Sequence, residues 1–139
     1  MSNIGISAED EMFRESARRW INDECPKQYC RELERRENEF PHELWQKLTE
    51  FGAHGIGVQE KYGGQGGTII TQALFGRELA RVAAGIGWVW GVTSFSGAKT
   101  IGFCGNKDQK SRFLPGIAAG EIKTAMSYTE PGGGTDLLG

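Results

Sequence analysis

The sequence is short of proline and cysteine, has no long apolar run and carries no excess of charge of one sign. Four prolines beside 21 glycines in 139 residues exclude a collagen-like chain or a proline-rich linker. Sixteen Lys and Arg against 18 Asp and Glu disfavour a nucleic-acid-binding surface. No apolar stretch reaches the roughly 18 residues of a membrane span, and the polar N-terminus lacks a signal-peptide core. We therefore expect no nucleic-acid partner and no membrane segment.

The three cysteines give little support for a disulfide or a metal site. Cys25, Cys30 and Cys104 cannot all pair within one chain, and without a secretion signal they indicate reduced thiols in the cytoplasm. Cys25 and Cys30 near His42 could be read as half of a zinc site. The second Cys/His pair that a structural zinc site needs is missing. We expect no metal and interpret these cysteines as small residues on or near helices.

Most of the chain has the apolar spacing of helices. A chain of 139 residues is long enough for one domain with its own core. Residues Phe13, Ala17, Trp20 and Ile21 recur on one helical face after the capping residue Ser7. The same reasoning predicts an all-α, bundle-like domain of about five to six helices, with later helices over residues 41–51, 68–84, 88–103 and 106–114. We expect Gly85 and Gly87 to interrupt the helical structure between residues 84 and 88, and Pro115 to end the last helix.

The pattern changes after residue 120. Apolar and polar side chains alternate over residues 121–129, which predicts a β-strand. A strand needs a partner for its backbone donors and acceptors, and within the chain only residues 56–58 offer one. We therefore expect a truncated chain, or one that depends on another polypeptide.

A glycine-rich loop follows the predicted strand. Three consecutive glycines, Gly132 to Gly134, let backbone N–H groups converge on an anion, and Thr129 and Thr135 add two hydroxyls. A flexible turn is the alternative. The spacing fits neither the Rossmann fingerprint nor the P-loop.

Four stretches of the sequence resemble the acyl-CoA dehydrogenase family. Residues 127–136, SYTEPGGGTD, are similar to its flavin-binding stretch. Residues 40–48, 55–66 and 105–115 resemble its second helix, its glycine-rich loop and a later helix, in the same order. The sequence departs from the usual pattern at Met126, where many members have an aromatic residue, and at Gln59, Gly133 and Thr135.

The resemblance implies a division of the chain. Residues 1–121 would be the helical N-terminal domain, and residues 122–139 the first strand and flavin-binding loop of a β-domain that is otherwise missing. In this family FAD lies between the β-domain and a C-terminal helical domain. The catalytic base is a glutamate of that C-terminal domain, so the resemblance assigns no catalytic residue here.

The resemblance also implies binding residues. The flavin ring would contact Met126, Tyr128 and Thr129, while Gly134 and Thr135 would meet its phosphate side or the CoA thioester end. One wall of the acyl pocket would comprise Trp88, Val89, Val92 and Ser96. The alternative for Trp88 and Val92, which are four residues apart, is that both are simply core residues.

The implied activity is FAD-dependent α,β-dehydrogenation of an acyl-CoA, with hydride transfer to flavin N5. The implied partners are the acyl-CoA substrate, an electron-transferring flavoprotein as acceptor, and further copies of the full-length protein in a dimer or tetramer. Two alternatives stay open. The chain could be a separately encoded, non-catalytic subunit, or part of an acyl-CoA oxidase or flavin monooxygenase of the same fold.

Overall fold

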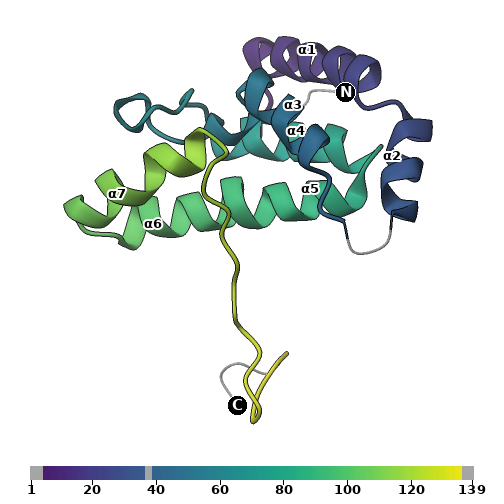
Figure 1. Cartoon of the computed structure of the whole chain (residues 1–139). Coiled ribbons are helices and arrows are strands. Elements are labelled where there is room, and N and C mark those ends of the chain that lie inside the picture. Colours follow the sequence, from purple (N-terminus) through teal and green to yellow (C-terminus); the bar gives the residue numbers. More distant parts are fainter. Residues whose placement is uncertain (1–4, 37–38, 136–139) are drawn as a thin grey trace.

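Helices form nearly all of the regular structure. The computed structural model describes residues 5–36 and 39–135, and this part of the chain is folded into a helical body with an extended tail (Figure 1). This confirms the all-α prediction. None of its helices is both long and apolar enough to cross a bilayer. The elements are α1 (Ala8–Glu24), α2 (Lys27–Arg35), α3 (His42–Phe51), the 3-10 turns η1 (Ala53–Gly55) and η2 (Glu60–Tyr62), α4 (Ile69–Ala80), α5 (Ala84–Trp90), the π-helical segment η3 (Gly91–Gly97), α6 (Ala98–Cys104) and α7 (Lys107–Ala118).

Local sequence signals set the starts of three helices. Ser7, Thr68 and Asn106 cap α1, α4 and α7, and each side-chain oxygen accepts a hydrogen bond from a backbone N–H of the first turn. These bonds satisfy donors that a helix leaves free at its N-terminus. A local signal also marks one helix end. Gly52, at the C-terminus of α3, adopts a left-handed conformation with φ of 79°, as expected for a glycine that ends a helix.

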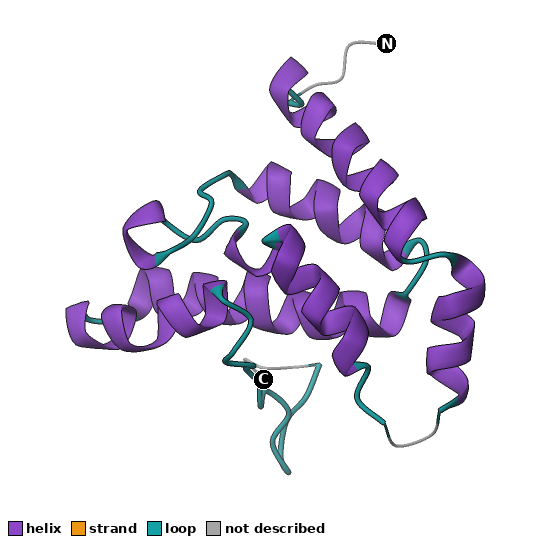
Figure 2. Cartoon of the chain, turned by 45° about the horizontal axis from the view of Figure 1, so that its top comes forward, coloured by secondary structure: helices purple, strands orange, loops and turns teal. Residues whose placement is uncertain are grey.

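Helices α5, η3 and α6 follow one another without a break and form a single rod (Figures 1 and 2). The expected break at Gly85 and Gly87 is wrong, because both glycines lie inside α5. Ile86 and Trp90 of α5 are buried in the core, and this burial outweighs the low helix propensity of glycine. A Cβ at Gly87 would lie 3.3 Å from the Ala80 Cα, so this glycine lets α4 and α5 approach closely.

Two further boundaries differ from the sequence prediction. Helix α4 ends at Ala80 and not near residue 84. Helix α7 continues past Pro115 to Ala118. A proline this close to the end of a helix removes one backbone donor, while Ile117 in the following turn is fully buried. The burial of that last turn favours its helical form.

An aromatic row forms the centre of the core. Trp20 stacks on Phe51 with ring centroids 4.4 Å apart, Phe51 lies 5.7 Å from Phe75, and Phe75 lies 5.0 Å from Trp90. These four residues belong to α1, α3, α4 and α5. The row therefore joins four helices drawn from the first 90 residues of the chain. A smaller cluster lies between the loop before η2 and helices α6 and α7; its buried members are Val58, Ala98, Leu114 and Ile117.

The expected strand over residues 121–129 is not formed. Within the described residues this segment pairs with no other strand and leaves the helical body as the tail seen in Figure 1. Its candidate partner is engaged elsewhere, because Ile56 makes an isolated bridge with Gly66. Alternation of side chains gives an extended backbone, but a strand also needs a hydrogen-bonded neighbour. Residues 136–139 of the predicted second domain lie outside the described residues.

One buried histidine makes stability depend on pH. His54 is fully buried, its Nδ1 lies 3.0 Å from the Ser94 Oγ, and its ring is tilted against that of Trp45 with centroids 4.2 Å apart. Burial lowers the pKa of His54 from 6.5 to about 4, with a smaller effect from Lys123. The folded state thus disfavours the charged imidazolium.

We predict that the free energy of unfolding is highest above about pH 6.5 and falls progressively towards pH 4. The unfolded chain binds a proton on His54 over this range and the folded chain does not. The loss amounts to about 3 kcal/mol at most. Urea unfolding at several pH values measures it. His54→Gln should flatten this pH dependence, whereas His42→Gln, at an exposed position, should leave it unchanged. An unchanged slope in His54→Gln would contradict the assignment.

Candidate functional site

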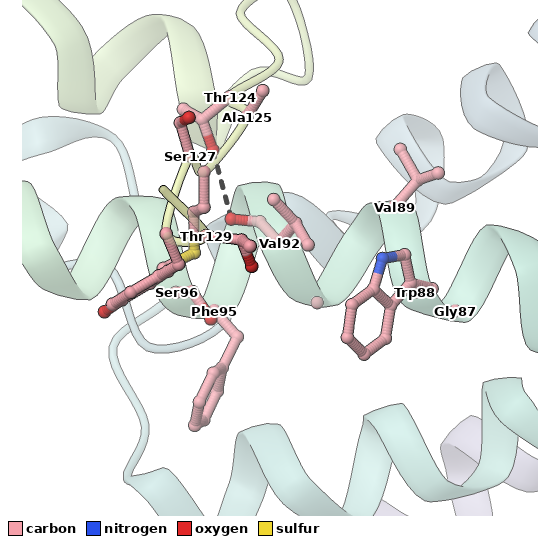
Figure 3. Close-up of a pocket in the computed structure, with 13 residues that line it drawn as sticks. Gly87, Trp88, Val89, Val92, Phe95, Ser96, Thr124, Ala125, Ser127 and Thr129 are labelled. Carbon is pink, nitrogen blue, oxygen red and sulfur yellow. Dashed lines mark hydrogen bonds between the residues drawn. The ribbon is translucent and has the colours of Figure 1, made fainter. Parts of the chain in front are cut away.

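A pocket of about 930 Å³ lies between the α5–η3 part of the rod and the tail (Figure 3). Two segments more than 25 residues apart in the sequence form its walls. The lining residues are Gly87, Trp88, Val89, Gly91, Val92, Phe95, Ser96 and the continuous run from Thr124 to Thr129. The pocket thus joins the helix of the predicted acyl wall to the segment of the predicted flavin contacts.

The rod presents one helical face to the pocket. Three residues follow Trp88 at helical spacing: Val92, Phe95 and Ser96 lie four, seven and eight residues after it. All four therefore share one face of a helix. Gly91 lies among them, and a Cβ there would meet nothing within 4 Å. The small residue leaves the middle of this wall open. The result is an apolar wall with a single hydroxyl group, that of Ser96.

The interpretation of Trp88 as a core residue is wrong. Its side chain is 76% exposed, whereas Trp90, two residues on, is 2% exposed and donates a hydrogen bond to the Ala53 carbonyl. Trp88 and Trp90 are about 200° apart around a helix, so only one of them can face the core. Val92 is half-buried and borders the pocket. Val89 borders the pocket and also packs against the core.

The tail forms the opposite wall. Thr124 is held on the rod: its N–H donates to the Thr93 Oγ1 at 3.2 Å, and its Oγ1 donates to the Val92 carbonyl at 3.0 Å, the dashed line in Figure 3. Beyond Thr124, Met126 is 42% exposed and Tyr128 63% exposed. Over residues 125–129 the backbone has no hydrogen-bond partner within the described residues. Its donors and acceptors are therefore free for a ligand.

The glycine-rich loop lies beyond this wall. Glu130 and Gly133 exchange two backbone hydrogen bonds of 2.9 and 3.2 Å, so the loop closes as a tight turn. A Cβ at Gly134 would lie 3.5 Å from the Thr129 Cγ2. Gly134 is thus next to the pocket-lining Thr129, but neither Gly134 nor Thr135 lines the pocket.

Most of the predicted binding residues meet in this one pocket. The structure brings together Trp88, Val89, Val92, Ser96, Met126, Tyr128 and Thr129. Sequence reasoning missed six of the lining residues: Gly87, Gly91 and Phe95 on the rod, and Thr124, Ala125 and Ser127 on the tail. Phe95 lies seven residues after Trp88, so helical spacing alone could have found it. The glycines carry no such signal, because they contribute space and not a side chain.

The chemistry available in the pocket is binding and not proton abstraction. Its polar side chains are the hydroxyls of Ser96, Thr124, Ser127, Tyr128 and Thr129, and no carboxylate or imidazole is among the lining residues that the structure describes. Hydroxyls and free backbone groups suit the polar edge of a flat ligand, and the apolar wall suits a hydrocarbon chain. A general base must lie within hydrogen-bond reach of the proton it takes.

The cysteines near the start of the chain are buried away from the pocket. Cys25 and Cys30 are 0% and 2% exposed, and the Cys30 thiol lies 3.5 Å from the Cys25 carbonyl. Burial raises the pKa of the Cys25 thiol to about 12 and also raises that of Cys30. Both thiols are thus kept protonated, the form that does not bind metal. In the described part of the chain, no group of three or more His, Cys, Asp or Glu residues is placed to hold a metal ion.

Comparison with known proteins finds relatives among the acyl-CoA dehydrogenases. A family model described as "Acyl-CoA dehydrogenase, N-terminal domain" matches residues 7–121. The chain is 31% identical to an acyl-CoA dehydrogenase of Bacillus subtilis over 131 residues, 94% of this chain and 34% of that protein. It is 35% identical to the mitochondrial long-chain specific acyl-CoA dehydrogenase of Rattus norvegicus over 143 residues, 100% of this chain and 33% of that protein.

The solved structures agree. The crystal structure of an acyl-CoA dehydrogenase from Bacillus anthracis complexed with FAD superposes with a TM-score of 0.84 at 31% sequence identity, covering 100% of this chain and 24% of that one. The chain spans about a third of the length of the curated relatives it matches. The family match over residues 7–121 and the shared fold place this chain in the acyl-CoA dehydrogenase family, and the match is to its N-terminal domain.

Proposed function

We propose that this chain supplies one wall of the acyl pocket and the first flavin contacts of an FAD-dependent acyl-CoA dehydrogenase. The observation that carries the proposal is the single pocket that joins the apolar face of α5 and η3 to the tail ending at Thr129. FAD, when bound, would supply the acceptor for a hydride from the β-carbon of the acyl chain. The residues of this chain bind and orient, and they exclude water from one side of the reacting atoms.

The tail has the features that a flavin ring needs. An isoalloxazine is a flat apolar surface with polar atoms along its edge. Met126 and Tyr128 offer exposed apolar side chains, and Thr129 offers a hydroxyl. The backbone donors and acceptors of residues 125–129 have no partner in the part of the chain that the structure describes. Gly134 lies against Thr129. We propose Gly134 and Thr135 as contacts farther along the same cofactor or towards the thioester.

The rod has the features that an acyl chain needs. Trp88, Val89 and Val92 line the pocket without filling it, and the open space at Gly91 continues it along the helix. Ser96 lies at the far end of this face. Each methylene that moves from water into such a groove contributes about 0.8 kcal/mol at full burial. We propose these residues as the acyl-binding wall.

The rest of the proposed enzyme follows from the same assignment. We propose residues 1–121 as the helical domain and residues 122–139 as the start of the β-domain, with the glutamate base outside this chain. We further propose an electron-transferring flavoprotein as the electron acceptor and a dimer or tetramer as the assembly. The free thiols of Cys25, Cys30 and Cys104 support a reducing compartment, the cytoplasm.

We predict that the purified chain does not oxidise acyl-CoA by itself. Among the residues that the structure describes, no carboxylate lines the pocket to take the α-proton, and general-base catalysis requires a base in place. The assay contains an acyl-CoA, added FAD and an artificial electron acceptor. Its positive control is a complete acyl-CoA dehydrogenase under the same conditions. Turnover by the pure chain would contradict the assignment of the base to another part of the enzyme.

We predict that acyl-CoA thioesters bind the chain with an affinity that rises with acyl length, by up to about fourfold per methylene. Binding should change the fluorescence of Trp88, which is 76% exposed at the pocket. The measurement is a fluorescence titration with thioesters of increasing length.

Trp88→Phe should lose the signal in that titration. Trp20→Phe, in which the replaced ring stacks on Phe51 in the core, should keep it. Free CoA should give no chain-length effect. A signal that is independent of acyl length, or that is kept in Trp88→Phe, would count against the acyl pocket.

We predict weak FAD binding by the chain alone. The contacts to the flavin ring proposed here come from one exposed segment, Met126 to Thr129, and only Gly134 and Thr135 are proposed beyond it. One face of the ring therefore stays in water and little apolar area is buried. A titration that follows flavin fluorescence should show no saturation at micromolar concentration. Tight, one-to-one binding would refute the view that this chain forms only part of the flavin site.

A further inference from the structure

The π-helical segment η3 depends on side chains from outside the rod. In a π-helix the N–H of residue i+5 bonds to the carbonyl of residue i, as the Ala98 N–H does with the Thr93 carbonyl. The wider turn leaves carbonyls open to other donors. The Thr124 Oγ1 donates to the Val92 carbonyl at 3.0 Å, and the Gln72 Nε2 donates to the Ser94 carbonyl at 3.2 Å. Two side chains from distant parts of the sequence thus hold this turn.

Thr124 makes a second bond to the same turn. Its backbone N–H donates to the Oγ1 of Thr93, a fully buried residue, at 3.2 Å. Thr124 therefore donates two hydrogen bonds to the rod, one from its hydroxyl and one from its backbone N–H. Gly97 allows the contact, because a Cβ at position 97 would lie 2.2 Å from the Thr124 Oγ1. The fit between Gly97 and Thr124 is a close one.

The two residues before Thr124 are also held. Ile122 packs on Gly116 of α7, where an added Cβ would lie 2.6 Å from the Ile122 Cδ1. The Lys123 Nζ lies 4.8 Å from the centre of the Phe40 ring and 5.0 Å from that of Trp45. Over residues 125–129 the tail borders the pocket but makes no backbone hydrogen bond within the described residues. Thr124 is thus the last residue that hydrogen-bonds to the rod before residues 125–129, which line the pocket.

We propose that Thr124 is a positioning residue, which joins the π-helical turn to the tail and sets the register of residues 125–129 along the pocket. In an extended segment, a slip of one residue exchanges the two faces. Such a slip would move Met126 and Tyr128 off the face on which Thr124 places them. The proposal rests on the proposed function only for the identity of the ligands in this pocket; the contact itself does not depend on them.

Trypsin cleavage at Lys123 tests the proposal without any ligand. Cleavage of the Lys123–Thr124 bond requires this segment to leave the rod, so its rate follows the population of the open form. Thr124→Val keeps the shape and removes the hydroxyl donor. Loss of the hydrogen bond from the Thr124 hydroxyl to the Val92 carbonyl should accelerate release of the C-terminal peptide about fivefold, as measured by mass spectrometry. Cleavage at Lys107 and Lys110 of α7 is the internal reference, and Thr124→Ser should restore the wild-type rate.

A glycine pair provides the matched control. Gly97→Ala should accelerate cleavage at Lys123, because its methyl group displaces Thr124. Gly91→Ala lies in the same π-helical segment, where an added Cβ meets nothing within 4 Å, and should not. If circular dichroism shows that Thr124→Val does not fold, the cleavage rates of the two alanine variants test the proposal instead. Rates for Thr124→Val within twofold of wild type, or equal rates for the two alanine variants, would overturn the proposal. Faster cleavage together with absent acyl-CoA binding would overturn the proposed function alone.

Discussion

The widened turn of η3 is the constraint on which the rest of the site depends. Its open carbonyls need donors, since an unpaired buried carbonyl costs free energy comparable to a lost hydrogen bond. Gln72 bonds the Ser94 carbonyl from the core side, and also the Ile56 carbonyl at 2.8 Å. Thr124 bonds the Val92 carbonyl from the tail side. The π-helical turn thus links α4, the loop at residues 55–66 and the tail. It also directs Val92 and Ser96 towards the pocket.

The core and the pocket use opposite faces of the same rod. Trp90 closes the aromatic row through its contact with Phe75, while Trp88 stands exposed at the pocket. The rod is therefore fixed by burial on one side, and its other side is left free for binding. This division explains why a segment so rich in glycine stays helical. The energy that holds it comes from Ile86 and Trp90 against the core and not from its own helix propensity.

Local chemistry made much of the fold predictable. Ser7, Thr68 and Asn106 mark helix starts because capping depends on residues that are adjacent in sequence, and Gly52 marks an end for the same reason. The loop at residues 130–133 is likewise local. The sequence also brought Trp88, Val92, Met126 and Thr129 forward as one site, but through resemblance to a family. No spacing rule links residues 88 and 126, which line one pocket because folding places the tail against the rod, where Thr124 donates two hydrogen bonds.

What the sequence by itself determined is the all-α class, the helix starts and the extended form of residues 121–129, because each depends on periodicity or on neighbouring side chains. Tertiary structure alone decided the continuous helix through Gly85 and Gly87 and past Pro115, where burial overrides local preference. It also decided that the alternating segment forms no strand in the described chain, because a strand requires a hydrogen-bonded neighbour. The π-helical turn belongs with these, since its partners Gln72 and Thr124 are brought to it by folding alone.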